Sequence, residues 1–151
     1  LLSSTGMRVG ELVKLNINDI DFENRECVVF GKGNKERPVY FDARTKIHLK
    51  NYLNARTDNN PALFVGLKSP YNRLSKAGIE DMIRRTGERA GVEKAHPHRF
   101  RGTSITNAIN RGMPLQEASI MAGHAKTETT MLYCSVDQES VKYHHKKYLS
   151  A

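Results

Sequence analysis

One stretch, "ECVVFGKGNKERPVYF" at residues 26–41, constrains the fold more than any other part of the chain. Two runs rich in β-branched and aromatic residues flank a charged, glycine-containing turn at residues 31–35, a pattern that is typical of a β-hairpin. Elsewhere the apolar residues recur at helical spacing. The sequence therefore predicts an α+β fold that is mainly α-helical, with one small antiparallel β-sheet.

Helices are predicted on both sides of the hairpin. One begins near residue 7, and the others cover residues 45–56, 76–90, 97–111, 114–122, 127–133 and 138–149. Ser75 is placed to cap the helix that follows it, and Gly91 lies just past the end of that helix. The residues expected to face the core from the helices at 45–56 and 76–90 are Ile47, Leu49, Tyr52, Leu53, Ile79, Met82, Ile83 and Ala90.

The charge balance indicates what kind of partner the chain binds. Its 151 residues include 24 Lys and Arg against 16 Asp and Glu, a formal net charge of +8. A basic folded domain of this length favours a polyanion, above all nucleic acid, because binding releases counterions. Two cysteines make no disulfide framework, and no apolar run approaches the ~18 residues of a membrane span. We therefore expect a cytoplasmic protein that binds nucleic acid and no membrane.

Several cationic side chains occupy predicted helix starts. His98 and Arg101 stand three residues apart at the start of a helix, where free backbone N–H groups also suit an anion. Arg8 begins another helix, and Glu11 is spaced to hold its guanidinium. Taken alone, the pair of His98 and Arg101 is more typical of a solvated basic helix start.

Four motifs, "TGMRVGEL", "GKGNKERPV", "PHRFRGTS" and "AGHAKTETTMLY", follow one another in this order between the first residues and about residue 135. Together they resemble the catalytic domain of the tyrosine recombinases, the phage integrase family. The resemblance implies that residues 1–151 form such a domain. It also implies a fragment that lacks the family's N-terminal core-binding domain and the first catalytic-domain helix.

The resemblance assigns a role to each position that matches a motif. The implied catalytic residues are Arg8, Lys32, His98, Arg101, His124 and Tyr133, with Glu11 orienting Arg8. The implied DNA contacts are Lys35, Arg37, His96, Arg99 and Lys126. The chain departs from the family at Gly102, where a histidine is frequent, so an orienting contact is expected to be missing there.

Such a set of residues suits phosphoryl transfer without a cofactor. Attack on a DNA phosphodiester concentrates negative charge on oxygen, which the guanidinium groups of Arg8 and Arg101 can meet. Tyr133 would be the nucleophile, because neighbouring cations can stabilise a phenolate whose ordinary pKa is about 10. Lys32 would protonate the departing 5′ oxygen. The expected intermediate is a 3′-phosphotyrosine.

The resemblance also implies a biological role. It points to a site-specific recombinase or integrase of a phage or mobile element, acting on double-stranded DNA sites in the bacterial cytoplasm and nucleoid. A tetramer is expected on DNA and a monomer without it. The helix at 138–149 is expected to pack on a neighbouring protomer or on its own domain.

Other interpretations stay open at this level. A type IB topoisomerase shares the chemistry, a degenerate recombinase would only bind DNA, and a metal-dependent nuclease is the third alternative. Lys35 or Arg37 could replace Lys32 as the acid, and Tyr133 could be a core residue. A zinc site would use His96, His98 and His124.

Overall fold

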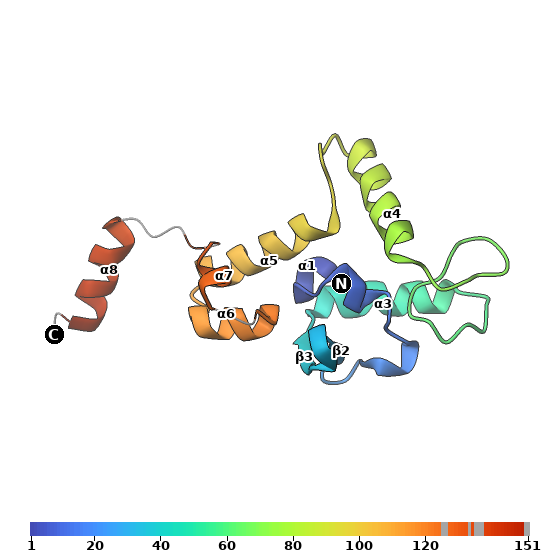
Figure 1. The fold of residues 1–151 in the computed structure, drawn as a ribbon, viewed down its shortest axis with the longest axis horizontal. Helices are drawn as coiled ribbons and strands as arrows, with labels where there is room; N and C mark the ends of the chain where they lie inside the picture. The colour runs from blue at the N-terminus through green and yellow to red at the C-terminus, as the bar shows by residue number, and fades with distance from the viewer. Residues whose placement is uncertain (125–126, 133, 135–137, 150–151) are drawn as a thin grey trace.

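A computed structural model describes residues 1–124, 127–132, 134 and 138–149 (Figure 1). The helices are α1 (Leu2–Thr5), α2 (Val9–Leu12), α3 (Ala43–Ala55), α4 (Lys76–Arg89), α5 (Pro97–Asn110), α6 (Leu115–Ala122), α7 (Thr127–Met131) and α8 (Gln138–Leu149). The strands are β1 (Ile20–Asp21), β2 (Glu26–Phe30) and β3 (Glu36–Tyr40), and the 3₁₀ turns are η1 (Ile17–Asp19) and η2 (Lys32–Asn34). The predicted fold class, mainly α-helical with a small antiparallel sheet, is confirmed.

The predicted hairpin is formed by β2 and β3. The two strands are antiparallel, with Val29 opposite Arg37, and the backbone N–H of Gly31 donates to the carbonyl of Lys35 over 2.8 Å. β1 adds a third strand in the order β1-β2-β3. The sequence does not predict β1, because two residues carry no readable alternation.

Capping residues stand at the starts of α3 and α4. The side chain of Asp42 accepts from the backbone N–H of Thr45 at the start of α3, and that of Ser75 accepts from Gly78 at the start of α4. Both contacts satisfy N–H groups that have no partner within the helix. The expected cap at Ser75 is confirmed.

The buried stripes of α3 and α4 are narrower than predicted. Ile47 is 60% exposed, whereas Leu49 is buried. Residues two apart lie about 200° apart around a helix, so these two cannot share one buried face. Met82 and Ala90 are exposed for a similar reason, since only the Ile79 and Ile83 side of α4 meets the core.

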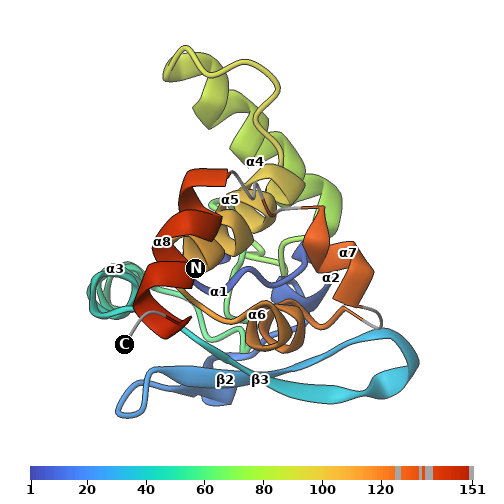
Figure 2. The ribbon, with the colours of Figure 1, turned by 90° about the vertical axis from the view of Figure 1, so that its left-hand side faces the viewer.

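The main core lies between the sheet and the helices α2, α3 and α4. Its fully buried members include Leu12, Val29, Val39, Leu49 and Leu63. Beyond the sheet, α5 packs on α1 and on α6, and Figure 2 shows β2 and β3 running beneath α6. The sheet therefore connects the core to the helices that carry the histidine and arginine motifs.

The start of the chain contains a break that the sequence does not predict. α1 ends at Gly6, whose φ of 64° is left-handed, and Arg8 is extended before α2 begins at Val9. Arg8 is thus the N-cap of α2 rather than part of its first turn.

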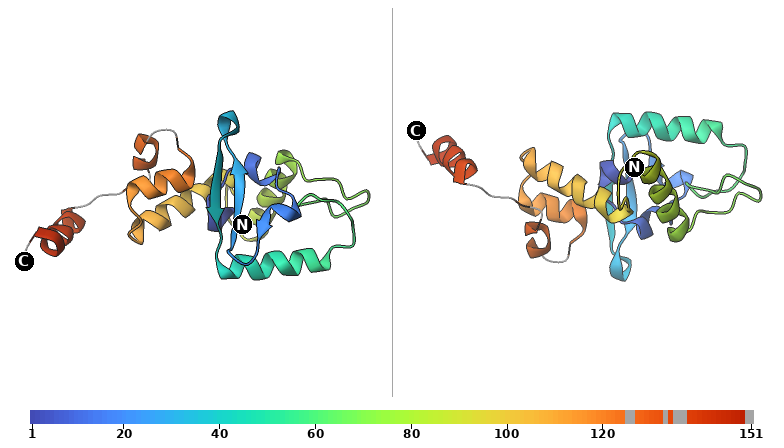
Figure 3. Two further views of the ribbon diagram at one scale, coloured as in Figure 1. Left: turned by 90° about the horizontal axis from the view of Figure 1, so that it is seen from below. Right: turned by 90° about the horizontal axis from the view of Figure 1, so that it is seen from above.

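α8 stands apart from the rest of the fold (Figure 3). Its large apolar side chains Val141, Tyr143, Tyr148 and Leu149 are all exposed. The structure therefore does not show the alternative in which this helix packs on its own domain. Among the described residues, none of the helices combines the length and the apolar character that a membrane crossing requires.

Candidate active site

An open groove of ≈ 1360 Å³ collects the motif residues from four separate parts of the chain. Its lining comes from α2, from Phe30–Gly31 of the hairpin, from α4 with the start of α5, and from His124, Thr129 and Leu132. The predicted site residues that line it are Arg8, Glu11, His96, His98, Arg101 and His124. Further lining cations are Lys14, Lys76, Arg84 and Lys94, with Glu80 and Asp81 as acidic neighbours.

Arg8 is anchored at its base and half-exposed to the groove. Its backbone N–H donates to Glu11 Oε2 over 2.7 Å, and its Nη1 lies 3.3 Å from Glu11 Oε1. Its Nη2 donates to the carbonyl oxygen of Gly123 over 3.1 Å. These contacts hold the guanidinium between α2 and the end of α6, while 44% of the side chain stays exposed.

Arg101 lies in the floor of the groove, and only 4% of it is exposed. Its Nη1 donates to the carbonyl of Gly6 and its Nη2 to the carbonyl of Ala122, both over 2.6 Å. These carbonyls lie where α1 and α6 end, and helix ends leave such acceptors without partners inside the helix. Two helix ends thus fix the guanidinium in place.

His98 stands on the first turn of α5, exposed to the groove. The ring of His96, the N-cap of that helix, lies nearly parallel to it, with an interplanar angle of 6° and centroids 6.3 Å apart. Pro97 at the first helical position fixes the backbone between them. His98 and Arg101 both line the groove, the first exposed and the second buried.

His124 follows the left-handed Gly123 that ends α6. Its Nδ1 lies 2.8 Å from the hydroxyl of Thr130, a fully buried residue of α7. Burial, and then the charges of Arg101 and Arg8, lower the pKa of His124 to about 4. At neutral pH the His124 ring is therefore neutral, with one nitrogen that can donate a hydrogen bond and one that can accept.

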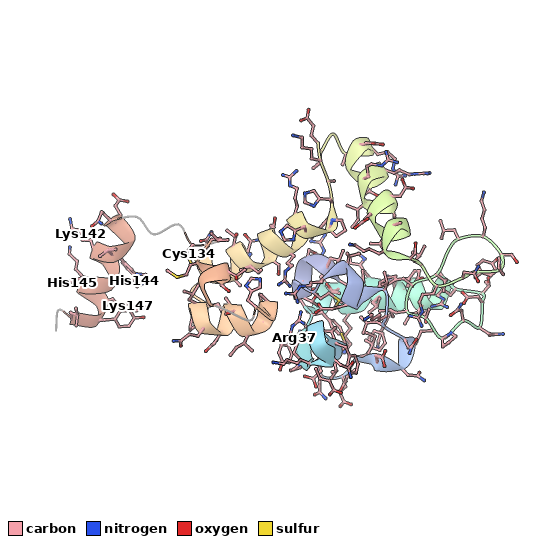
Figure 4. The ribbon with its side chains drawn as sticks, viewed as in Figure 1. Arg37, Cys134, Lys142, His144, His145 and Lys147 are labelled. Carbon is pink, nitrogen blue, oxygen red and sulfur yellow. The ribbon has the colours of Figure 1, made fainter. Side chains whose placement is uncertain are left out.

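Glu11 and Arg37 form a buried ion pair that corrects one expectation. Arg37 was expected to contact DNA, but its Nη1 and Nη2 donate to the two carboxylate oxygens of Glu11 over 2.6 and 2.9 Å. Its Nε donates to the carbonyl of Met121 over 3.3 Å, and only 11% of its side chain is exposed (Figure 4). Arg37 does not line the groove, in contrast to the buried Arg101, so it is not placed to meet DNA there.

The alternation of β3 could have indicated this position. Residues two apart on a strand share a face, so Arg37 lies on the same side as the buried Val39, opposite the exposed Glu36 and Tyr40. The motif match drew attention to its charge instead. Burial alone would raise the pKa of Glu11, but hydrogen bonds from Arg37 and Arg8 outweigh it and lower that pKa.

The remaining predicted site residues either are exposed or lie partly or wholly outside the described residues. Lys35 is exposed at the end of the hairpin turn, and Arg99 is exposed and donates to the carbonyl of Glu93 over 2.7 Å. Lys32 is described by its backbone alone, within η2. Lys126 and Tyr133 lie outside the described residues. Leu132 and Thr129, which neighbour them in the sequence, line the groove.

The histidines do not form a metal site. In the part of the chain that the structure describes, no three His, Cys, Asp or Glu side chains are grouped closely enough to share a metal ion. The zinc alternative is therefore not supported by the positions of His96, His98 and His124.

The amino-acid sequence is similar to those of known recombinases. Tyrosine recombinase XerC of Staphylococcus aureus is 36% identical over 159 residues, which covers 100% of this chain and 51% of that protein. Tyrosine recombinase XerC of Corynebacterium glutamicum is 34% identical over 142 residues, covering 92% of this chain and 46% of that protein. The chain thus spans about half the length of the curated relatives it matches.

Solved structures give the same result. The crystal structure of XerA recombinase has a TM-score of 0.80 and 31% identity, over 99% of this chain and 56% of that one. The XerH site-specific recombinase bound to its difH substrate has a TM-score of 0.78 and 26% identity, over 99% of this chain and 45% of that one. The family model described as phage integrase family matches residues 1–140. With that match, the XerC relatives and the shared fold, the chain belongs to the phage integrase family.

Proposed function

We propose that this chain is the catalytic domain of a tyrosine site-specific recombinase, which cuts and rejoins DNA through a 3′-phosphotyrosine on Tyr133. The observation that carries the proposal is the meeting of Arg8, His98, Arg101 and His124 in one groove, although they come from widely separated motifs. Family membership gives independent support.

The groove is suited to a scissile phosphate. Arg101 is held rigidly in its floor and Arg8 reaches it from the side, so two guanidinium groups can meet charge on the non-bridging oxygens. Because their protein contacts already fix them, they would reorganise little during the reaction. His98 adds a hydrogen-bond donor at the mouth.

The proposed reaction exchanges one phosphodiester for another. Tyr133 Oη forms a bond to phosphorus, its proton passes to the imidazole of His98 or His124, and the bond from phosphorus to the 5′ oxygen breaks. Lys32 protonates that oxygen as it leaves. A 5′ hydroxyl from the partner strand then attacks the phosphotyrosine and gives its proton to Lys32. The bond from phosphorus to Tyr133 Oη breaks, and the phenolate takes its proton back from the imidazole. No external energy source is needed, because the number of phosphodiester bonds is conserved.

We also propose that the protein acts on paired double-stranded DNA sites as a homotetramer in the bacterial cytoplasm and nucleoid. The exposed apolar side chains of α8, together with the basic Lys142, His144, His145 and Lys147 (Figure 4), support a role for this helix in contact with another protomer. The XerH recombinase, whose structure was solved with its difH substrate bound, supports DNA as the partner.

We further propose that the protein comes from a phage or a mobile element. Integration joins two different sites, whereas resolution joins two copies of one site. Once a cleaved site is known, pairing it with a copy of itself and with different genomic sites would tell the two apart. Efficient recombination of identical copies alone would contradict the mobile-element origin.

Trapping of the covalent intermediate tests the reaction. The protein is incubated in EDTA with a library of nicked duplexes of random sequence, and covalently attached duplexes are isolated on denaturing gels and sequenced. We expect enrichment of one site, and no attachment with the Tyr133→Phe variant. Attachment without site preference, with relaxation of plasmid DNA, would favour a type IB topoisomerase. Binding without attachment would favour an inactive DNA-binding module, and cleavage only without EDTA a nuclease.

A further inference from the structure

The Glu11–Arg37 ion pair joins α2 to β3, and its carboxylate also holds Arg8. Both carboxylate oxygens of Glu11 accept from Arg37, and the same two oxygens accept from the backbone N–H and Nη1 of Arg8. Glu11 is only 4% exposed. A buried carboxylate can stay ionised at such a position because both of its oxygens accept hydrogen bonds from Arg8 and Arg37. One carboxylate thus sets the relative positions of two arginines.

Arg37 also packs directly against the turn that carries His124. A Cβ atom added to Gly123 would lie 2.9 Å from both Cζ and Nε of Arg37, closer than side chains approach one another. The Nε of Arg37 donates to Met121 on the same turn. Since the Gly123 carbonyl accepts from Arg8, Arg37 touches both groups that anchor Arg8, namely Glu11 and Gly123.

The hairpin meets the same point. A Cβ atom on Gly31 would lie 3.8 Å from Glu11 Oε1 and 3.9 Å from Arg37 Nη1. Gly31 begins the turn whose next residue is Lys32, and its N–H closes that turn onto Lys35. The ion pair therefore lies directly beneath the base of the hairpin turn.

We propose that Arg37 is a positioning residue, which fixes Arg8 and the Gly123–His124 turn relative to the hairpin through its contacts with Glu11 and Gly123. The inference rests on the proposed recombinase function. Arg37 does not touch the scissile phosphate. It sets the geometry of groups that do, and it links three elements of the site, α2, β3 and the end of α6.

The test compares Arg37→Lys with a matched control, Arg56→Lys. Lysine keeps the charge but cannot make the paired contacts of a guanidinium. Arg56 is also a buried arginine, paired through two nitrogens with Asp58 and donating to the carbonyl of Ala62, but it lies outside the groove. Both variants lose a buried guanidinium, so a general loss of stability affects both.

Two measurements separate positioning from folding. The first is the single-turnover rate constant for covalent attachment to saturating nicked duplex, with Kd for that duplex measured separately. The second, without DNA, is the NMR shift of the His124 ring and of the Arg8 Nε–H group. We expect Arg37→Lys to lower the rate constant about 100-fold with Kd unchanged, and to move both resonances. Arg56→Lys should do neither.

Several outcomes would overturn the inference. Unmoved Arg8 and His124 resonances in Arg37→Lys would do so whatever happens with DNA, as would an unchanged rate constant. If the unsubstituted protein attaches to no duplex, the proposed function fails, and the resonances alone decide on positioning. If Arg37→Lys does not fold, the double variant Glu11→Met/Arg37→Met replaces the pair with apolar volume, and an unchanged rate constant there would count against the inference.

Discussion

Arg101 donates a hydrogen bond of 2.6 Å to the carbonyl oxygen of Gly6, which lies 95 residues earlier in the chain. The contact joins a motif arginine to the end of the first helix. It makes the position of a proposed phosphate ligand depend on the main chain of the first motif, two residues before Arg8.

Replacement of Arg101 by lysine should weaken both the fold and the reaction. A lysine cannot reach the Gly6 and Ala122 carbonyls together, and a buried acceptor left without its donor costs about 1–3 kcal/mol. Urea unfolding should show this loss in the free energy of unfolding, and covalent trapping should show a slower reaction. Arg99→Lys, at an exposed neighbour on the same helix, is the control and should change the free energy of unfolding little.

Gly123→Ala should be more harmful than an alanine at a comparable glycine. Gly123 and Gly91 both have left-handed backbone, with φ of +62° and +69°, so alanine costs about 1–2 kcal/mol at either. Only at Gly123 would the new methyl group collide with Arg37. Thermal unfolding should rank Gly123→Ala below Gly91→Ala. Equal losses would mean that Arg37 moves aside without cost.

The stability of the protein should fall as the pH drops from about 6.5 towards 4. In the unfolded chain His124 takes up a proton near its ordinary pKa of about 6.5. The folded protein keeps it neutral, because its pKa is lowered to about 4. The unfolded state therefore binds more protons within this interval, and the contribution to stability that is present above pH 6.5 is lost on acidification.

Urea unfolding at pH 7.5, 6.0 and 5.0 measures this dependence. His124→Gln should unfold with a smaller change across these pH values, whereas His48→Gln, at an exposed position on α3, should keep the dependence of the unsubstituted protein. An identical pH dependence for His124→Gln and the unsubstituted protein would assign the effect to other groups.

Removal of the apolar surface of α8 should separate cleavage from assembly. Val141→Ser/Leu149→Ser changes exposed side chains that lie outside the groove. We expect covalent attachment to a single duplex to persist, and the amount of paired-duplex complex on native gels to fall. Glu139→Gln, on the same helix, serves as a control for substitution there. Undiminished pairing in the double variant would exclude these two side chains from assembly.

Local signals predicted much of the fold. The hairpin, the cap at Ser75 and the glycine ends of α4 and α6 each depend on a few neighbouring residues, and the structure confirms them. α1 and β1 were missed because they are too short to show periodicity. Ile47 was misplaced because it lies about 200° around the helix from the buried Leu49, so the two could not share one face.

For the site, the sequence predicted which motif residues line one groove, but it did not predict the role of Arg37. The groove brings Arg8, His98, Arg101 and His124 together as the motifs predicted. The role of Arg37 was missed because its partner Glu11 stands 26 residues away, on an element whose position relative to β3 depends on the folded core. A positive charge in a motif does not show whether it faces solvent or a buried carboxylate.

Both motif arginines take their anchors from main-chain oxygens at the ends of helices, namely Gly6, Ala122 and Gly123. A main-chain oxygen is present whatever residue supplies it, so substitutions within the helices that leave the left-handed Gly6 and Gly123 unchanged preserve these anchors. A deletion of one residue within α6 is different, because it turns the remaining helix by about 100° and shifts it by about 1.5 Å. Substitutions within these helices should therefore disturb the groove far less than insertions or deletions that change the length of the helices.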